Sequence, residues 1–267
     1  MRHHVCKRVV VKVGTSTLTY ENSKPNFRRM ERIARVLSDF KNAGNEVILV
    51  SSGAVAVGVN RMGLAERPRD TKGRQAASAV GQCSMMSLYD RFFSEYGQVV
   101  GQILLTRDVI EDDARKRNVV NTFHALLENG TIPIVNENDS VSTEELEGTA
   151  FGDNDKLSAI VAAIVNADTL IILTDTDGLY DADPRENPAA RLIETVEVIT
   201  PEMLRNAGGN GTARGTGGMK TKLEAAAFAT GRGIDVFVVN GQKWALLYDI
   251  LNGGFAGTYF KGQSEAK

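Results

Sequence analysis

Residues 8–16, RVVVKVGTS, decide the fold of this 267-residue chain, because an apolar strand runs there directly into a turn of small and hydroxyl residues. Continuous apolar character is typical of a parallel strand that helices cover on both faces. Lys12 interrupts this run, and a lysine in a buried strand is costly unless it is paired. The alternative is an edge strand with a solvated lysine. Gly14, Thr15 and Ser16 favour the buried strand, since α/β proteins place ligands at such strand ends.

The same alternation of apolar runs and helical periodicity continues along most of the chain. Helical spacing is found between Asn26 and Gly44, and it recurs at 71–96, 118–128, 154–166, 218–232 and 243–251. This βαβ rhythm predicts a doubly wound, three-layer α/β fold with a mainly parallel central sheet. The predicted strands are 8–13, 46–50, 99–105, 131–135, 169–173 and 234–239.

Composition excludes several classes of protein. The formal net charge of −2 gives no basic excess for nucleic acid binding. Two cysteines and three histidines are too few for a disulfide framework or a typical zinc site, so we expect no metal held by side chains alone. No apolar run is long enough to span a membrane, and residues 1–8 contain no signal segment. We therefore expect a cytoplasmic protein that binds neither nucleic acid nor membrane.

Small residues also follow the second predicted strand, in VSSGA (50–54). Ser52 can be simply the N-cap of the next helix, which is a common role for serine. The exposed N–H groups at the start of that helix can also face an anion. The two interpretations are compatible, because a cap position is already an anion site.

Two segments in the middle of the chain are rich in amides and carboxylates. NENDS (136–140) follows the fourth predicted strand, and GDNDK (152–156) leads into a helix. Such residues can merely form a tight turn or cap a helix. Alternatively, Asp139 can hold an ammonium group, and Asp155 can orient two lysines.

The last two motifs are typical of a nucleotide site. LTDTDGLY (173–180) ends the fifth predicted strand, and its Asp-Gly pair is either a turn or a contact to ribose or adenine. GTGGMKTK (215–222) begins a helix; it is either a flexible turn with surface lysines or a phosphate-binding loop. We favour the loop, because glycine, threonine and lysine gather at a helix N-terminus. Lys222 then projects toward the same cleft as Lys12.

Taken in order, these segments resemble the amino acid kinase family, and within it the enzymes that phosphorylate the side-chain carboxylate of L-glutamate. The resemblance extends from residue 10 to about residue 239. The matching strings are VVKVGTS, VSSGA, AVGQ, GQILLTR, PIVNENDSV, FGDNDKLSA, LTDTDGLY and GTGGMKTK.

The resemblance implies a three-layer αβα sandwich in which residues 1–267 form a single kinase domain. Its glutamate-binding part would lie mainly in 1–170 and its ATP-binding part mainly in 171–260. The implied reaction converts L-glutamate and ATP to L-glutamate 5-phosphate and ADP, with Mg²⁺ on the nucleotide, as the first step of proline biosynthesis. Many such enzymes carry a further C-terminal domain of the PUA type, which we do not expect here because the sequence ends at Lys267.

The resemblance also implies a role for individual residues. Lys12, Lys222 and Asp155 match the catalytic positions, where the lysines stabilise the transferring phosphoryl group and the aspartate organises them. Ser52, Gly53, Asp139 and Asn154 match the glutamate-binding positions. The ATP-binding positions are Lys12, Thr174, Asp175, Thr216, Gly217, Gly218, Met219, Lys220, Thr221 and Lys222.

Further implied properties are feedback inhibition by proline and assembly as a homo-oligomer, either a dimer or a tetramer. Two other functions stay open. One is a sibling kinase acting on N-acetylglutamate, carbamate or a nucleoside monophosphate, although the carboxylate of Asp139 suits a free ammonium better. The other is a non-catalytic amino-acid-sensing module, against which the presence of Lys12, Asp155 and Lys222 argues.

Overall fold

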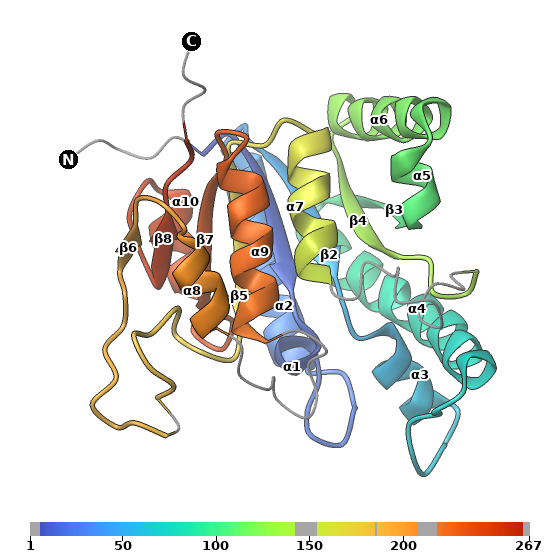
Figure 1. Ribbon diagram of the computed structural model, residues 1–267. Coiled ribbons are helices and arrows are strands. Elements are labelled where there is room, and N and C mark those ends of the chain that lie inside the picture. The colour runs from blue at the N-terminus through green and yellow to red at the C-terminus, as the bar shows by residue number, and fades with distance from the viewer. Residues whose placement is uncertain (1–5, 142–153, 185, 208–217, 264–267) are drawn as a thin grey trace.

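The central feature of the computed structural model is one eight-stranded sheet, built from the described residues 6–141, 154–184, 186–207 and 218–263 (Figure 1). Its strand order is β3-β4-β2-β1-β5-β7-β8-β6. All neighbouring strands are parallel except β7 and β8, which pair antiparallel. The strands are β1 (Arg8–Val13), β2 (Glu46–Ser51), β3 (Val99–Leu105), β4 (Thr131–Glu137), β5 (Thr169–Thr174), β6 (Thr195–Val196), β7 (Asp235–Asn240) and β8 (Thr258–Phe260).

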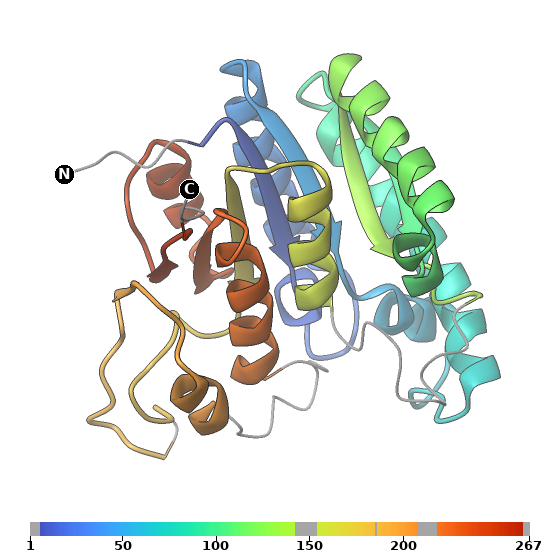
Figure 2. The ribbon, with the colours of Figure 1, turned by 45° about the horizontal axis from the view of Figure 1, so that its top comes forward.

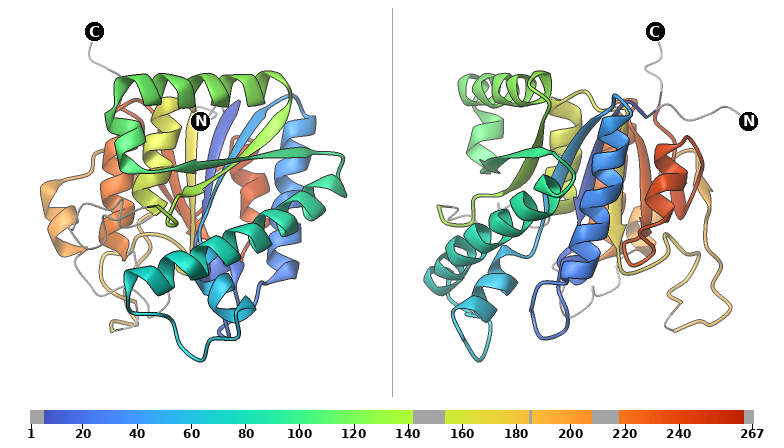
Figure 3. Two further views of the ribbon diagram at one scale, coloured as in Figure 1. Left: turned by 90° about the vertical axis from the view of Figure 1, so that its right-hand side faces the viewer. Right: turned by 180° about the vertical axis from the view of Figure 1, so that it is seen from behind.

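Helices on both faces of the sheet complete the three layers. On one face α7 and α9 lie side by side, in front of the strands in two views (Figures 1 and 2). On the other face lie α2, α4 and α10, which the view from behind shows (Figure 3). The helices are α1 (Thr15–Leu18), α2 (Phe27–Asn42), α3 (Ala54–Arg61), α4 (Thr71–Ser94), α5 (Arg107–Glu111), α6 (Asp113–Glu128), α7 (Asn154–Ile164), α8 (Pro201–Asn206), α9 (Met219–Thr230) and α10 (Leu246–Leu251).

The predicted fold class is confirmed. Each of the six predicted strands is present, and its ends differ by at most two residues from the prediction. The sequence patterns did not indicate β6 and β8, because two and three residues are too few to show a period. The strand order also excludes the edge-strand alternative for Lys12, since β1 lies between β2 and β5 and Lys12 is only 4% exposed.

Alternation along β1 divides its side chains between two apolar cores. Val9, Val11 and Val13 pack with α2, α4 and α10, whereas Val10 packs with α7 and α9. Because successive side chains of a strand point to opposite faces, Lys12 lies on the same face as Val10. The strand period therefore places this lysine on the face that α7 and α9 cover.

The parallel arrangement brings the carboxyl ends of β1, β2, β4 and β5 to one edge of the sheet. In doubly wound folds this edge, near the strand where the chain reverses its winding direction, is where ligands bind. Among the helices in the described part of the chain, none combines the length and apolar character that a bilayer crossing needs.

Candidate active site

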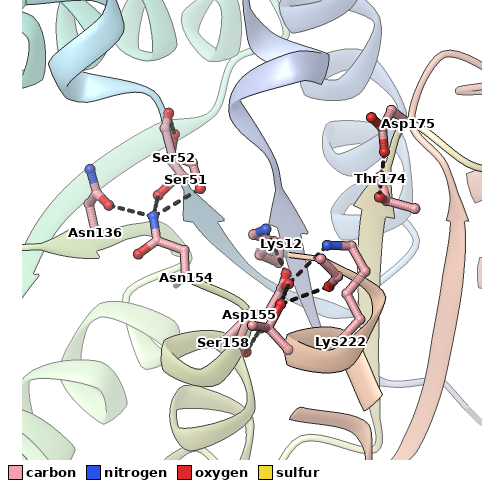
Figure 4. Close-up of polar contacts among 12 residues, drawn as sticks. Lys12, Ser51, Ser52, Asn136, Asn154, Asp155, Ser158, Thr174, Asp175 and Lys222 are labelled. Atoms are coloured by element: carbon pink, nitrogen blue, oxygen red, sulfur yellow. Dashed lines mark hydrogen bonds and ion pairs between the residues drawn. The ribbon is translucent and has the colours of Figure 1, made fainter. Parts of the chain in front are cut away.

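Two lysines and one aspartate form a buried ion cluster at the end of β1 (Figure 4). Lys12 Nζ lies 2.6 Å from Asp155 Oδ1, and Lys222 Nζ lies 3.0 Å from Asp155 Oδ2. The Asp155 side chain is fully buried, and those of Lys12 and Lys222 are 5% and 8% exposed. Three residues far apart in the sequence thus share one charged centre.

Local structure explains how the three side chains meet. Asp155 is in the first turn of α7, and Lys222 is in the first turn of α9. Both helices begin at the edge of the sheet where β1 ends, and Lys12 faces them from the strand (Figure 4). The positive ends of two helix dipoles therefore add to the two ammonium groups.

Hydroxyl groups hold the aspartate in position. Thr221 Oγ1 donates to Asp155 Oδ2 at 3.0 Å and also lies 2.9 Å from the carbonyl oxygen of Gly218. Ser158 Oγ donates to the backbone carbonyl of Asp155 at 2.6 Å. With both oxygens in polar contact, the carboxylate is fixed between the lysines rather than free to accept a proton from a substrate.

The charge balance of this cluster favours an anionic ligand. Two ammonium groups face one carboxylate, which leaves an excess of one positive charge in a site that is largely removed from water. Preorganised cations in such a site stabilise developing negative charge far more than they would in water.

A second, uncharged cluster lies beside the first, on the β2 and β4 side. Asn154 Nδ2 lies 2.7 Å from the carbonyl oxygen of Ser51, 2.9 Å from Ser52 Oγ and 2.9 Å from Asn136 Oδ1. Its two hydrogens are therefore shared among three acceptors. The cluster joins the ends of β2 and β4 to the start of α7 (Figure 4).

The start of α3 contributes backbone donors next to this cluster. The cap residue is Gly53, whose φ of 93° is left-handed and favours glycine, and no side chain caps the helix. The alternative in which Ser52 is merely the N-cap is therefore wrong. Ser52 is 8% exposed and instead accepts from Asn154.

Asp139 is the acidic residue predicted to meet an ammonium group, and it lies half-buried just beyond β4. Its Oδ2 accepts a hydrogen bond from Ser78 Oγ of α4 at 2.7 Å. This bond anchors the carboxylate to α4.

The end of β5 carries the predicted nucleotide contacts, on the opposite side of Lys12 and Lys222 from Asn154 (Figure 4). Thr174 Oγ1 donates to Asp175 Oδ1 at 3.2 Å, and the carbonyl of Thr174 accepts from the N–H of Gly241. The structure thus separates the two predicted binding regions by the width of β1.

Asp177 adds an ion pair near this strand end that the sequence did not indicate. Its Oδ1 lies 2.8 Å from Lys243 Nζ and accepts from Asn240 Nδ2 at 2.9 Å. The bond from Lys243, followed by that from Asn240, holds the pKa of Asp177 below its usual value.

At the start of α9, the remaining predicted residues differ in exposure. Gly218 is the N-cap and no side chain caps the helix, so its first N–H groups can meet an anion. Met219 and Thr221 are half-buried, whereas Lys220 is exposed. Thr216 and Gly217 lie outside the described residues.

Sequence reasoning did not assign a role to Asn136, Gln82 or Tyr89, although each contacts this site. Asn136 Nδ2 donates to Gln82 Oε1 at 2.9 Å, and the hydroxyl of Tyr89 lies 2.8 Å from Ser51 Oγ. The only signals available were the strings NENDS and AVGQ, in which an amide side chain is not distinctive on its own.

Comparison with known sequences extends this picture over almost the whole chain. A model described as the amino acid kinase family matches residues 7–240. The glutamate 5-kinase of Clostridium perfringens is 56% identical over 255 residues, which cover 95% of this chain and 95% of that relative. The glutamate 5-kinase of Listeria welshimeri is 51% identical over 261 residues, which cover 97% of this chain and 95% of that relative.

Solved structures with a similar fold are much more distant in sequence. A UMP kinase from Bacillus anthracis superposes with a TM-score of 0.65 at 17% identity and covers 97% of each chain. An isopentenyl phosphate kinase from T. acidophilum, in a product complex, superposes with a TM-score of 0.64 at 19% identity. The match covers 95% of this chain and 100% of the kinase chain. At such identities the likeness shows the fold alone.

Proposed function

The chain belongs to the amino acid kinase family, and we propose that it transfers the γ-phosphoryl group of ATP to the side-chain carboxylate of L-glutamate. The products are L-glutamate 5-phosphate and ADP, and the reaction is the first step of proline biosynthesis. The observation that carries the proposal is the buried cluster of Lys12, Asp155 and Lys222 beside the neutral cluster around Asn154.

The charged cluster suits the transfer itself. In phosphoryl transfer the negative charge spreads over the equatorial oxygens, so catalysis is mostly positioning and electrostatic stabilisation. The ammonium groups of Lys12 and Lys222 would contact the phosphoryl oxygens, while Asp155 holds both lysines at a fixed separation. Since the two reactants are both anions, this positive charge is also what allows them to approach.

The acceptor needs no general base. A glutamate side chain has an ordinary pKa near 4, so the attacking carboxylate is already ionised at neutral pH. An oxygen of that carboxylate forms the new P–O bond while the bond from the γ-phosphorus to the bridging oxygen of ADP breaks. Asp155 forms ion pairs with two lysines and does not serve as a base. This arrangement fits the chemistry, because no proton has to be removed.

The neutral side of the site suits the other end of an amino acid. The carboxylate of Asp139 and the carbonyl oxygen of Asn154 would accept hydrogen bonds from the α-ammonium group. Ser52 and the free N–H groups after Gly53 would donate to the α-carboxylate. A neutral N-acetyl amide would leave Asp139 without a charged partner, which disfavours N-acetylglutamate.

The nucleotide would bind across the end of β5 and the start of α9, through Thr174, Asp175 and the loop from Thr216 to Lys222. Glutamate would thus bind mainly to residues 1–170 and ATP mainly to residues 171–260. Mg²⁺ would enter on the phosphates of ATP, where it neutralises part of their charge.

Three further properties complete the proposal. The protein works in the cytoplasm, it assembles as a dimer or tetramer, and proline inhibits it. Proline shares its amino and carboxylate groups with glutamate, so the pocket chemistry around Asp139 and Ser52 supports binding of both. Size-exclusion chromatography with light scattering and a proline titration of the initial rate test the last two properties.

A substrate panel with the purified protein tests the reaction directly. L-glutamate should release ADP from ATP, and hydroxylamine should trap the acyl phosphate as a hydroxamate. N-acetylglutamate, carbamate and nucleoside monophosphates should give rates near that of ATP alone. Equal rates with N-acetylglutamate would favour a sibling kinase, and glutamate binding without turnover would favour a sensing module.

A further inference from the structure

A polar stripe runs along the buried face of the long helix α4. Ser78, Gln82 and Tyr89 are 3%, 8% and 1% exposed, and they share this face with Met85 and Phe93. The spacing of these residues is that of one helix face. Buried polar groups on an apolar face require partners, and each of the three finds its partner at the amino acid side of the active site.

The bond made by Gln82 has a defined direction. Asn136 Oδ1 accepts from the backbone N–H of Glu137 at 2.9 Å and from Asn154 Nδ2 at 2.9 Å. Because a backbone N–H can only donate, the oxygen of Asn136 must lie on that side. Its Nδ2 therefore faces Gln82, which must present the oxygen of its own amide at 2.9 Å.

The orientation of Asn154 follows from the same reasoning. The carbonyl oxygen of Ser51 can only accept, so the group 2.7 Å from it must be Asn154 Nδ2. The carbonyl oxygen of Asn154 then points away from Ser51 and Ser52 (Figure 4). An acceptor is thereby available to a ligand that carries N–H groups, such as an ammonium ion.

Close packing fixes the helix that carries Gln82. A Cβ atom at Gly58 would lie 1.7 Å from the carbonyl oxygen of Ala77, and one at Gly81 would lie 1.7 Å from that of Ala54. The backbones of α3 and α4 therefore touch at two points. This contact holds Gln82 at a constant distance from the start of α3, which lies next to the cluster around Asn154.

We propose that Gln82 is a positioning residue for the amino acid substrate. Its amide oxygen satisfies the buried N–H of Asn136, and through Asn136 it holds the side chain of Asn154 in the orientation that receives the ammonium group. This inference rests on the proposed function, since it assumes that the pocket binds glutamate. Gln82 itself does not touch the phosphoryl group or the nucleotide in this scheme.

Two substitutions at Gln82 distinguish the effect of its amide oxygen as an acceptor from the effect of its side-chain volume. Gln82→Met keeps a side chain of similar volume but leaves Asn136 Nδ2 without an acceptor. Gln82→Glu keeps an oxygen in that place. The matched control is Gln98→Met: Gln98 is 7% exposed and donates to an asparagine oxygen, that of Asn42, at 2.8 Å. Gln98 directly precedes β3, at the opposite edge of the sheet from the site.

The experiment measures KM for glutamate, KM for ATP and kcat, together with glutamate binding by calorimetry and thermal melting of each variant. For Gln82→Met we expect KM and the Kd for glutamate to rise roughly 10- to 100-fold, with KM for ATP within about twofold and kcat within about threefold of the starting protein. Gln82→Glu should return glutamate KM to within about threefold, and Gln98→Met should change only the melting temperature.

Several outcomes would overturn the inference: unchanged glutamate KM and Kd in Gln82→Met, an equal rise in KM for ATP, an equal rise in Gln98→Met, or no recovery in Gln82→Glu. If the unsubstituted protein itself neither binds nor phosphorylates glutamate, the proposed function fails instead. The two failures are therefore distinguishable.

Discussion

Asn154 and Asp155 are consecutive residues in the first turn of α7, yet they belong to two different kinds of buried cluster. Asp155 lies between two lysines, and each of its oxygens is within 3.0 Å of an ammonium nitrogen. Asn154 is surrounded by neutral acceptors, one of which is the backbone carbonyl of Ser51. Two consecutive residues of one helical turn therefore belong to a charged half and a neutral half of the site.

The difference concerns what keeps each half in place. The charged half depends on the one aspartate that compensates two lysines, so removal of Asp155 leaves two ammonium groups buried without a negative partner. The neutral half is held by backbone groups at the ends of β2 and β4 and by uncharged side chains, so removal of one side chain leaves no charge buried without a partner. We infer that the first half performs the transfer and the second positions the acceptor.

Asp155→Asn should have the largest effect, because it leaves two buried lysines without a negative partner. We expect the free energy of unfolding to fall by about 3–5 kcal/mol and turnover to be lost. Urea denaturation measures the first quantity, and added ATP should restore part of the stability because it binds only the folded protein. A loss below about 1 kcal/mol would show that the cluster does not depend on charge compensation.

Lys222→Ala should act mainly on the chemical step. Loss of one well-placed donor raises the barrier by about 3–4 kcal/mol, which corresponds to a fall in kcat of roughly 10²–10³-fold. Stability should change less than in Asp155→Asn, since Lys12 and Asp155 remain as a neutral pair. Lys261→Ala, at an exposed lysine paired with Glu197, is the control and should keep full activity. Undiminished turnover in Lys222→Ala would remove this lysine from the mechanism.

Asp139→Asn should weaken the binding of the amino acid selectively. The charged partner of the α-ammonium is lost, while an oxygen remains to accept from Ser78. We expect KM for glutamate to rise roughly 10- to 100-fold with little change in KM for ATP, and the preference over N-acetylglutamate to narrow. Initial rates with both acceptors measure this. If both KM values rise together, Asp139 supports the whole site rather than the amino acid.

The smallest effect should come from Asp177, which lies outside both halves. The pKa of Asp177 is lowered in the folded protein by Lys243 and Asn240, so its contribution to stability is present above its unfolded pKa and is lost as pH falls through the folded one. Because Asp177 and Lys243 are 37% and 57% exposed, the contribution should stay below about 1 kcal/mol.

Asp177→Asn should therefore be slightly less stable than the starting protein at pH 7. When urea denaturation is repeated at lower pH, the difference should begin to shrink at about pH 4, the usual aspartate pKa, and should disappear below the lowered pKa of the folded protein. A difference that persists or grows at low pH would mean that charge on Asp177 is not its cause.

Sequence patterns predicted the fold better than the neutral half of the site. The strands were evident because continuous apolar runs end in small or polar residues, as β1 and β5 do. A lysine in such a run, Lys12, signalled a buried partner. The motifs around Asp155 and Lys222 offered these residues only as one of two interpretations, and the resemblance then implied their catalytic roles. The three side chains meet because β1, α7 and α9 come together at one place in the fold. No local sequence pattern contains that information.

The neutral half was harder because amides carry no distinctive period or charge. Gln82 precedes Asn136 by 54 residues, and their bond depends on how α4 lies across the ends of β2 and β4. The tight contact of α3 with α4 at Gly58 and Gly81 fixes that geometry, and a glycine in a helical pattern does not reveal its neighbour. Short elements such as β6 and β8 were missed for a simpler reason, since they depend on pairing partners rather than on their own pattern.

We infer that the charged half transfers the phosphoryl group and the neutral half positions the amino acid. Calorimetric titration of L-glutamate into the Lys222→Ala protein tests this assignment most directly. We predict a Kd within about threefold of that of the unsubstituted protein, although turnover is almost abolished. If glutamate binding disappears together with turnover, the lysine contributes to holding the amino acid, and the separation between a transferring half and a positioning half is wrong.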